Sequence, residues 1–156
     1  MQAVGPNVRL RAAREEELPL LSALCLRSKA VWGYDQSFLD ACRVELTLSV
    51  EQLSGTWVRV AESNGAVVGL AQVSVAGKVA DLQKLFVEPA AIGLGVGRLL
   101  LAWACETARN QGADVLTIDA DPGAVGFYTR LGARQHGTAP SGSIPGRTLP
   151  HLRLAL

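Results

Sequence analysis

Residues 85–104 read LFVEPAAIGLGVGRLLLAWA and join a strand-like run, a turn and a helix-like run. The first run ends at a proline, glycines follow at Gly93, Gly95 and Gly97, and a long apolar segment then begins. Glycines at such a junction let the backbone come close to a ligand and turn its N–H groups toward it. Because a helix N-terminus adds the positive end of a dipole, this turn predicts a site for phosphate or pyrophosphate. Arg98 could add a charge-assisted contact.

The patterns on both sides of this turn predict one mixed α/β (α+β) domain, residues 1–156. Alternating and β-branched runs predict strands at residues 8–12, 57–62, 67–75, 79–87, 115–120, 133–138 and 149–154. Helical stripes predict helices at residues 15–27, 38–46, 96–111 and 124–131, with a loop at 27–37 and a short turn from Ser49. Asn64-Gly65 predicts a hairpin. The order is βααβββαβαββ, with a central mixed sheet of about six to seven strands flanked by helices.

The composition limits the class of protein. The chain has 156 residues, 49% hydrophobic and 19% charged, which suits one domain with a sizeable core. A net charge of +1 argues against a general nucleic-acid or anionic-membrane binder. The longest apolar run, residues 99–105, is far shorter than the ~20 residues of a membrane span, and the charged N-terminal stretch does not resemble a signal peptide. We therefore expect a soluble, cytoplasmic monomer or homodimer without nucleic-acid or membrane partners.

Cysteine and histidine usage argues against a disulfide framework and against a metal centre. Cys25, Cys42 and Cys105 are widely spaced, odd in number and outside any C-x-x-C pattern. His136 and His151 are the two imidazoles, so a metal site would have to rest mainly on carboxylates. Two of the cysteines lie on apolar helical stripes, where thiols are usually inert. We expect no metal and no acyl-cysteine intermediate.

Three glycine-rich phosphate motifs compete for residues 92–98. A Walker P-loop needs a lysine after its last glycine, and this chain has none there. A dinucleotide-binding G-x-G-x-x-G needs a third glycine where this chain has an arginine. The third pattern, [QR]-x-x-G-x-[GA] after a strand that ends V-x-P, matches at Gly95 and Gly97, with Val87 and Pro89 correctly placed.

This pattern resembles the GNAT superfamily of acetyl-CoA-dependent N-acyltransferases, in particular its small single-domain bacterial members, and the element order over nearly the whole chain is also similar. The resemblance implies that backbone N–H groups of the turn hold the coenzyme A pyrophosphate. Ile92 stands where the family usually has Gln or Arg, so a side-chain contact to phosphate is lost while the backbone cradle can remain. The alternative is a glycine-rich turn that merely packs a helix on a sheet. The implied coenzyme A contacts are Leu85, Phe86, Val87, Ile92, Gly93, Leu94, Gly95, Val96, Gly97, Arg98, Asp121, Ala124, Phe127 and Tyr128.

A second motif, DPGAVGFYTRLGA at residues 121–133, is similar to the family pattern N-x-x-A-x-x-F-Y-x-x-x-G-F. It matches at Ala124, Phe127, Tyr128 and Gly132 and departs from the pattern at Asp121 and Ala133. A tyrosine of ordinary pKa, ~10, is protonated at neutral pH and can donate a proton. Acetyl transfer from a thioester expels a thiolate that benefits from such a donor, so we predict that Tyr128 is the catalytic acid. The alternative is a core aromatic residue.

The catalytic base is predicted on the strand before the turn. An amine acceptor is protonated at pH 7 and must lose a proton before it attacks. By period two, Asp81 shares one face of its strand with Gln83, Leu85 and Val87. Several members of the resembled family carry a carboxylate at the position of Asp81 and use it as general base, often through water. Glu62 is a second candidate, and a solvated surface carboxylate is the alternative for either residue.

Two loops are predicted to flank the acceptor groove, as the resembled fold implies. The segment RSKAVWGYD, residues 27–35, and the segment SGSIPGRTLP, residues 141–150, are rich in charged, aromatic and hydroxyl side chains. We predict acceptor contacts from Arg27, Trp32, Tyr34 and Arg147. The two arginines could form forked contacts with a carboxylate or phosphate. Ordinary surface loops remain the alternative.

The predicted function is acetyl transfer from acetyl-CoA to a primary amine of a small molecule or peptide, directly within a ternary complex. Tyr128 and Asp81 favour catalysis, whereas Ile92 slightly favours weak or altered binding. A non-catalytic acyl-CoA binding or sensing module is therefore the alternative. A longer acyl chain or a hydroxyl acceptor is also compatible with these residues, and the sequence leaves the identity of the acceptor open.

Overall fold

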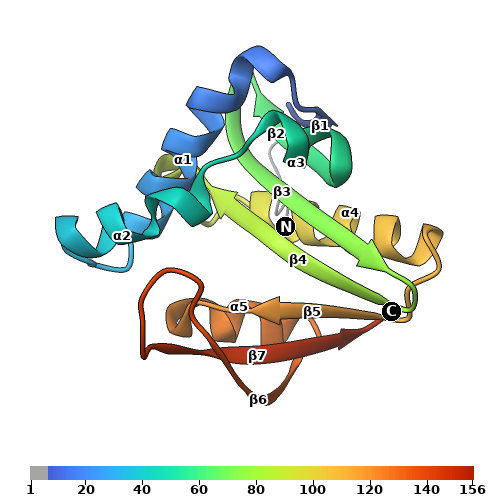
Figure 1. The fold of residues 1–156 in the computed structure, drawn as a ribbon. Coiled ribbons are helices and arrows are strands. Elements are labelled where there is room, and N and C mark those ends of the chain that lie inside the picture. Colours follow the sequence, from blue (N-terminus) through green and yellow to red (C-terminus); the bar gives the residue numbers. More distant parts are fainter. Residues whose placement is uncertain (1–6) are drawn as a thin grey trace.

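The computed structural model describes residues 7–156 and contains one seven-stranded mixed sheet (Figure 1), as predicted. The strands are β1 Val8–Ala12, β2 Trp57–Ser63, β3 Ala66–Ala76, β4 Val79–Val87, β5 Val115–Asp119, β6 Arg134–Pro140 and β7 Thr148–Ala155. Their order across the sheet is β1-β2-β3-β4-β5-β7-β6. Strands β4 and β5 pair in parallel, and the other neighbours pair antiparallel. The predicted hairpin between β2 and β3 is formed, with positive φ at Asn64 and Gly65.

The helices differ from the sequence prediction at two places. They are α1 Leu18–Ala30, α2 Gln36–Leu46, α3 Val50–Gly55, α4 Val96–Asn110 and α5 Val125–Arg130, with 3₁₀ turns at Glu15–Glu17, Pro89–Ala91 and Pro122–Ala124. Helix α1 continues beyond the predicted end at residue 27, so Arg27 and Lys29 lie in its last turn and not in a loop. The predicted turn after Ser49 is the short helix α3, because Ser49 and Gln52 form a reciprocal capping box at 3.1 Å.

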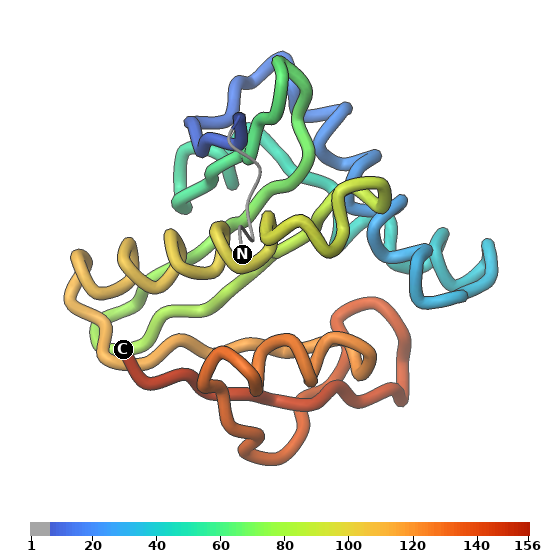
Figure 2. Tube along the Cα trace, turned by 180° about the vertical axis from the view of Figure 1, so that it is seen from behind, coloured from blue at the N-terminus to red at the C-terminus, as the bar shows by residue number. Residues whose placement is uncertain are grey.

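Helices cover the two faces of the sheet unequally. Helices α4 and α5 lie across one face, as the view from behind shows (Figure 2). Leu101, Ala104 and Cys105 of α4 pack there in one cluster with inward-facing residues of β4, β5 and β7. Helices α1 and α2 pack on the other face against β2, β3 and Phe86 of β4. Because α1 packs on one face of the sheet and α4 and α5 pack on the other, the space between these three helices is the place for the site described below.

Strands β4 and β5 separate after a short paired seam, and this divergence opens the site. Their register contains three pairs, Val79↔Val115, Ala80↔Leu116 and Asp81↔Thr117. Beyond the seam both strands continue, β4 to Val87 and β5 to Asp119, while moving apart (Figure 1). Asp81 therefore stands at the point where the two arms of the sheet part.

A β-bulge in β4 corrects the predicted face of Asp81. The register jumps from Val73↔Leu82 to Gln72↔Lys84, so Gln83 is an extra residue in β4. A bulge reverses the alternation of side chains beyond it. Leu85 consequently packs with Leu82 on the α4 side, while the side chain of Asp81 lies on the opposite face. Period two alone had placed Asp81 with Leu85 and Val87, which is wrong.

Candidate functional site

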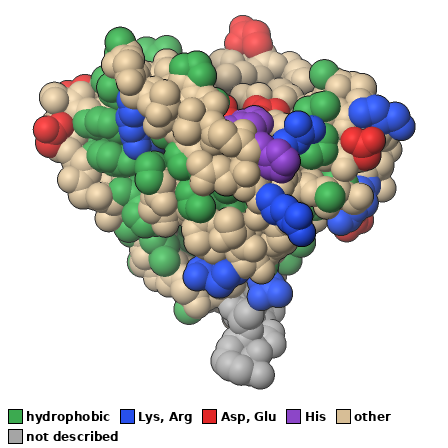
Figure 3. All heavy atoms as spheres, turned by 90° about the horizontal axis from the view of Figure 1, so that it is seen from below, with side chains coloured by type: hydrophobic (Ala, Val, Ile, Leu, Met, Phe, Trp, Pro, Cys, Tyr) green, Lys and Arg blue, Asp and Glu red, His purple; other side chains and the backbone are tan. Residues whose placement is uncertain are grey.

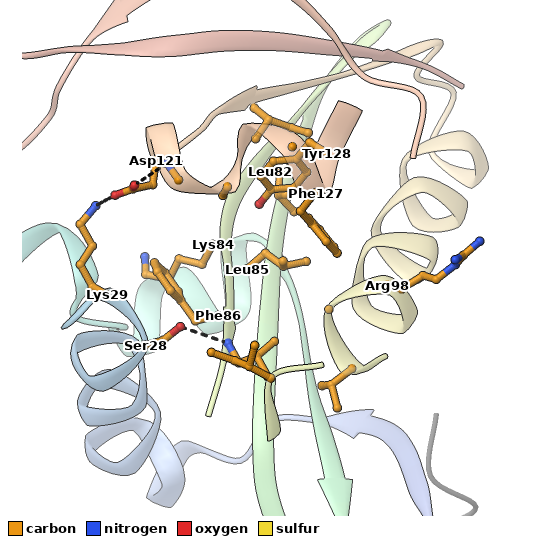
Figure 4. A pocket seen from close by; sticks show the side chains of 18 of the residues that line it. Ser28, Lys29, Leu82, Lys84, Leu85, Phe86, Arg98, Asp121, Phe127 and Tyr128 are labelled. Carbon is orange, nitrogen blue, oxygen red and sulfur yellow. Dashed lines mark hydrogen bonds and ion pairs between the residues drawn. The ribbon is translucent and has the colours of Figure 1, made fainter. Parts of the chain in front are cut away.

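A cavity of about 700 Å³ occupies the space between the diverging strands and the surrounding helices (Figure 4). This volume is in the range of small-molecule and cofactor sites. Its walls come from the end of α1, the second half of β4, the start of α4, the end of β5 and α5. Of the fourteen predicted coenzyme A contacts, thirteen line this cavity and Leu94 does not.

The glycine turn, residues 92–98, closes one end of the cavity with free backbone donors. Gly93 and Gly95 have φ of +88° and +84°, a conformation that L side chains rarely adopt. Gly95 is the N-cap of α4 and no side chain caps this helix. The N–H groups of Gly95, Val96, Gly97 and the next residue donate to no backbone acceptor among residues 7–156. Together with the helix dipole, they form a site for an anion.

Two arginines belong to the wall of the cavity. Arg98 belongs to the cavity wall, but its side chain points away from the cavity in Figure 4. It also borders a second hollow of about 410 Å³ between α4 and the ends of α5 and β7, together with Glu106 and Arg109. Arg130 of α5 lines the main cavity and was not predicted from the sequence. Its place in the cavity wall became evident only once α5 had been placed against α4.

Tyr128 lies at the far wall of the cavity, on α5. Its side chain packs against Phe127 edge to face at 5.1 Å between ring centroids, and Phe127 in turn contacts the position of Gly97. The residue is 6% exposed, and burial raises the pKa of its phenol well above the ordinary value. The Tyr128 hydroxyl takes part in no side-chain hydrogen bond within residues 7–156. Among these residues the one fully buried side-chain polar atom without a partner belongs to Ser143, so the Tyr128 oxygen retains some exposure. Tyr128 therefore offers a protonated, unengaged hydroxyl to the cavity.

Asp81 is held at the seam by two hydrogen bonds. Its carboxylate accepts from Thr117 Oγ1 at 2.7 Å and from Gln83 Nε2 at 2.9 Å. Burial raises the pKa of Asp81, and the hydrogen bond from Thr117 opposes this shift. The carboxylate does not line the cavity itself, although Leu82, the next residue, does. A carboxylate with a raised pKa at this position fits a proton acceptor.

The sequence analysis missed a histidine–carboxylate pair beside Asp81. His151 Nδ1 lies 2.7 Å from Oδ1 of Asp119, directly across β5 and β7. Asp119 lines the cavity, and both residues influence the pKa of Asp81, with Asp119 raising it and His151 lowering it. Figure 3 shows histidine side chains beside acidic and basic ones on this side of the molecule. The sequence carried no signal for the pair, because the strand register alone brings residues 119 and 151 together.

Glu62, the second predicted base, lies at the other end of the sheet. Its carboxylate binds Arg9 and Arg11 across the β1–β2 pair, at 3.0 and 2.9 Å. Hydrogen bonds from these arginines lower the pKa of Glu62. The residue does not line the cavity. Its partners therefore indicate that Glu62 stabilises the β1–β2 edge.

The predicted acceptor residues divide into two groups. Tyr34 and Arg147 meet at Asp121, a residue of the cavity wall: the Tyr34 hydroxyl donates to Asp121 at 2.7 Å and Arg147 donates to the Tyr34 oxygen at 2.7 Å. Lys29 reaches the same Asp121 carboxylate at 3.4 Å. Trp32 lines the cavity and lies flat on the backbone at residue 123. Lys29, Trp32 and Asp121 thus line the side of the cavity next to α1, whereas Tyr34 and Arg147 are connected to it through Asp121.

Arg27 does not join that group. Its guanidinium donates two hydrogen bonds to the Glu88 carboxylate, at 2.8 and 2.7 Å, and these bonds lower the pKa of Glu88. The pair ties the end of α1 to the end of β4. Ser28 strengthens the same junction, because its hydroxyl accepts from the Val87 N–H at 3.3 Å.

Two absences hold for the part of the chain that the structure describes. Among residues 7–156, no group of three His, Cys, Asp or Glu side chains is arranged to hold a metal ion. None of the helices in that range combines the length and the apolar character of a membrane span. Cys25, Cys42 and Cys105 are buried free thiols.

Residues 22–133 match the sequence model of the Acetyltransferase (GNAT) family. The chain is 35% identical over 142 residues to the aminoalkylphosphonate N-acetyltransferase of Salmonella typhimurium, a match that covers 85% of this chain and 88% of the relative. It is 28% identical over 82 residues to the glucosamine 6-phosphate N-acetyltransferase of Trypanosoma brucei brucei, covering 48% of this chain. The match spans 56% of the length of that second relative.

Solved structures share the fold. A GCN5-related N-acetyltransferase from Rhodopseudomonas palustris superposes with a TM-score of 0.80 at 24% identity, over 98% of each chain. The PaiA N-acetyltransferase of Thermoplasma acidophilum, solved in complex with coenzyme A, superposes with a TM-score of 0.77 at 15% identity, over 96% of this chain and 99% of the other. At these identities the likeness establishes the fold.

Proposed function

The chain belongs to the GNAT family of acetyltransferases and is an acyltransferase, and we propose that it moves an acetyl group from acetyl-CoA to the primary amine of a small molecule. The observation that carries this proposal is the cavity itself. The cavity has free backbone donors at one end and the Tyr128 hydroxyl at the far wall, and the Asp81 carboxylate lies beside the seam, just outside the lining residues. Transfer within a ternary complex needs these three groups around one space.

The residues present fit coenzyme A. The glycine turn offers N–H groups and a helix dipole to the pyrophosphate, and an added Cβ at Gly97 would approach Phe127 Cζ at 3.3 Å. Leu85, Phe86 and Val87 form an apolar wall from the turn toward the seam. When bound, acetyl-CoA supplies the activated acyl thioester. The chain's own residues bind it, orient it and exclude water.

Tyr128 is proposed to protonate the departing thiolate. Its phenol is unengaged, faces the cavity and, with its raised pKa, remains protonated at physiological pH. A positioned donor of this kind contributes typically ~10²–10⁴-fold to a rate. Proton transfer to the sulfur atom completes the cleavage of the C–S bond.

Asp81 is proposed to accept the proton that the acceptor ammonium must lose. The bulge at Gln83 directs Asp81 to the face of the sheet opposite α4, so the acceptor approaches from that face. Asp119 lies on the same face and also lines the cavity, which supports this path from the surface to the seam. The Asp119–His151 pair lies beside this path.

A small-molecule acceptor is favoured over a peptide. Asp121, which lines the cavity, is bound by Tyr34, Arg147 and Lys29, so polar side chains cross-link the wall next to α1. Both curated relatives are named for small amines that carry a phosphorus oxyanion. Such an acceptor is compatible with a site bordered by lysine and arginine side chains.

The test is acetyl-CoA-dependent thiol release measured with a panel of small amines, amino acids and peptides. Steady release with at least one small amine, together with the acetylated product in a mass spectrum, is the expected result. Coenzyme A binding without release on any acceptor would instead support a non-catalytic acyl-CoA binding module. Release with peptides but not with small amines would contradict the acceptor class.

A further inference from the structure

Lys84 is a buried lysine in the wall of the cavity, and the mechanism above does not use it. The residue is 5% exposed, and its Nζ donates to Oε1 of Gln72 at 3.0 Å. Gln72 in turn donates to the Thr56 hydroxyl at 3.1 Å, and that hydroxyl donates to the backbone oxygen of Gln52 at 2.6 Å. This chain of bonds fixes the Gln72 amide with its oxygen toward the lysine. Lys84 therefore has one neutral acceptor.

No carboxylate among residues 7–156 forms an ion pair with Lys84. Burial lowers the pKa of the Lys84 ammonium, and the charges of Cys25 and Glu45 only partly oppose this shift. A buried cation without a counter-ion is unfavourable, because it has lost its hydration and gained no opposite charge. Of the three N–H groups of the ammonium, two have no acceptor in this wall.

Lys84 differs in this respect from the other lysine of the wall. Lys29 lies on the same side of the cavity, but its ammonium is paired with Asp121 (Figure 4). In the same view Lys84 lies beside Phe86, between β4 and the end of α1. The side of the cavity next to α1 thus contains one cation whose charge is compensated and one whose charge is not.

We infer that Lys84 forms an oxyanion subsite, so that the amine acceptor carries a phosphonate, phosphate or carboxylate group whose oxygens pair with this lysine. The inference rests on the proposed function and narrows its substrate class. Acceptor binding supplies the counter-ion that the protein itself lacks. The cofactor does not need this cation, because its pyrophosphate is held at the glycine turn on the α4 side, whereas the bulge directs Lys84 to the other face.

The spacing along β4 fits a short acceptor. Asp81 and Lys84 lie opposite Ser74 and Gln72 of β3, which are two positions apart, so the bulge shortens the span between them to about 7 Å along the strand. Both side chains lie on the face opposite α4, and the lysine side chain is long enough to reduce this span. An amine near Asp81 and an oxyanion at Lys84 are therefore joined by a few carbon atoms.

The test compares three acceptors of similar length, 2-aminoethylphosphonate, 3-aminopropanoate and propylamine. In the wild-type protein the two oxyanion acceptors should have a KM at least about tenfold lower than propylamine. Lys84→Gln keeps a donor for Gln72 and removes the charge, so it should raise the KM of the oxyanion acceptors by about 10–100-fold, as expected for a hydrogen bond to a charged group. The KM values of propylamine and acetyl-CoA should not change. Lys84→Arg should restore part of the loss.

Lys78→Gln is the matched control, because Lys78 is exposed in the β3–β4 turn and should behave as wild type. Calorimetric binding of 2-aminoethylphosphonate in the presence of coenzyme A gives a readout that does not need turnover, and thermal unfolding checks that each variant is folded. Equal KM values for all three acceptors in the wild-type protein would overturn the subsite while leaving the proposed function intact. An equal loss of kcat on every acceptor in Lys84→Gln would also overturn it. Oxyanion binding without turnover on any amine would support the subsite and contradict the function.

Discussion

Arg27 in the last turn of α1 is bound by Glu88 at the end of β4 through two parallel hydrogen bonds, of 2.8 and 2.7 Å. Both donors of the fork are used, and the Arg27 side chain is half exposed. Exposed ion pairs contribute at most about 1 kcal/mol to stability. The pair therefore helps to hold the end of α1 against the end of β4, and it directs the Nε–Nη2 edge of the guanidinium to Glu88 at a site that does not line the cavity.

The two arginines predicted as acceptor contacts should consequently differ on mutation. Arg147→Ala removes the partner of Tyr34 and Asp121 beside the cavity, so the acceptor KM should rise by about tenfold with little change for acetyl-CoA. Arg27→Ala should change the acceptor KM by less than twofold. Steady-state kinetics on both variants checks this. A larger acceptor effect for Arg27→Ala would restore its predicted role.

Tyr128→Phe should lower kcat by ~10²–10⁴-fold, because it keeps the ring packing and removes the proton donor. Acetyl-CoA affinity should change little, since one neutral hydrogen bond contributes about 0.5–1.5 kcal/mol. Burial raises the pKa of Tyr128, so wild-type kcat should not fall from loss of this proton as the pH approaches 10. The measurement is turnover across pH with chemistry rate-limiting. Turnover within twofold of wild type would remove Tyr128 from the mechanism.

Gly95→Ala should weaken coenzyme A binding at least tenfold. A side chain at φ +84° costs about 1–2 kcal/mol, and relief of that strain moves the N–H groups that face the ligand. Gly77→Ala is the matched control, because Gly77 also has positive φ but lies in the β3–β4 turn away from the cavity. Calorimetry and thermal unfolding should show similar destabilisation of both variants. Loss of affinity in Gly77→Ala as well would indicate a global effect.

Asp81→Asn should lose activity and gain stability at neutral pH. The pKa of Asp81 is raised by burial, so the folded protein binds this proton more tightly than the unfolded chain. The contribution of Asp81 to stability is therefore present below the ordinary Asp pKa and is lost as pH rises through the raised pKa. Over that same interval wild-type kcat/KM should rise, because the base must be ionised to accept a proton. Asp40→Asn, at an exposed site on α2, is the control. A pH profile unchanged in Asp81→Asn would exclude it as the base.

Gly123→Ala should displace Trp32. A Cβ at position 123 would lie 2.6 Å from Trp32 Cε3, which is closer than real contacts allow. Because Trp32 lines the cavity, the acceptor KM should rise severalfold and the tryptophan emission should shift. Gly55→Ala, where a Cβ meets open space at the end of α3, should leave both quantities unchanged. Unchanged kinetics in a folded Gly123→Ala would show that Trp32 does not contact the acceptor.

Features with local signals could be predicted from the sequence. The bounds of β4 and the start of α4 at Val96 follow from an apolar run, a proline and glycines that are neighbours in the chain. The β2–β3 hairpin follows from two adjacent turn residues with positive φ. The thirteen predicted residues that line the cavity could be named because they lie in two continuous sequence motifs.

Features that depend on strand register could not be predicted. At the bulge, two steps along β4 face one step along β3, so Gln83 has no partner. The sequence of β4 alone does not show which residues of β3 it pairs with. The pairs Arg27–Glu88 and Asp119–His151 join positions far apart in the chain. Lysine side chains are usually exposed, so nothing in the sequence predicts that Lys84 is buried. Its burial follows from the bulge, which turns the side chain toward α1.

The short seam between β4 and β5 also affects aggregation. Beyond Asp81 and Thr117 the facing edges of both strands have no strand partner, and free edges of this kind normally recruit other chains. Here both edges face a hollow between helices α1, α4 and α5, so a chain that pairs with them has to enter this hollow. A slender ligand with amide groups can reach them and pair with the backbone. The divergence therefore keeps these two strand edges away from the outer rim of the sheet, where edge-to-edge association starts.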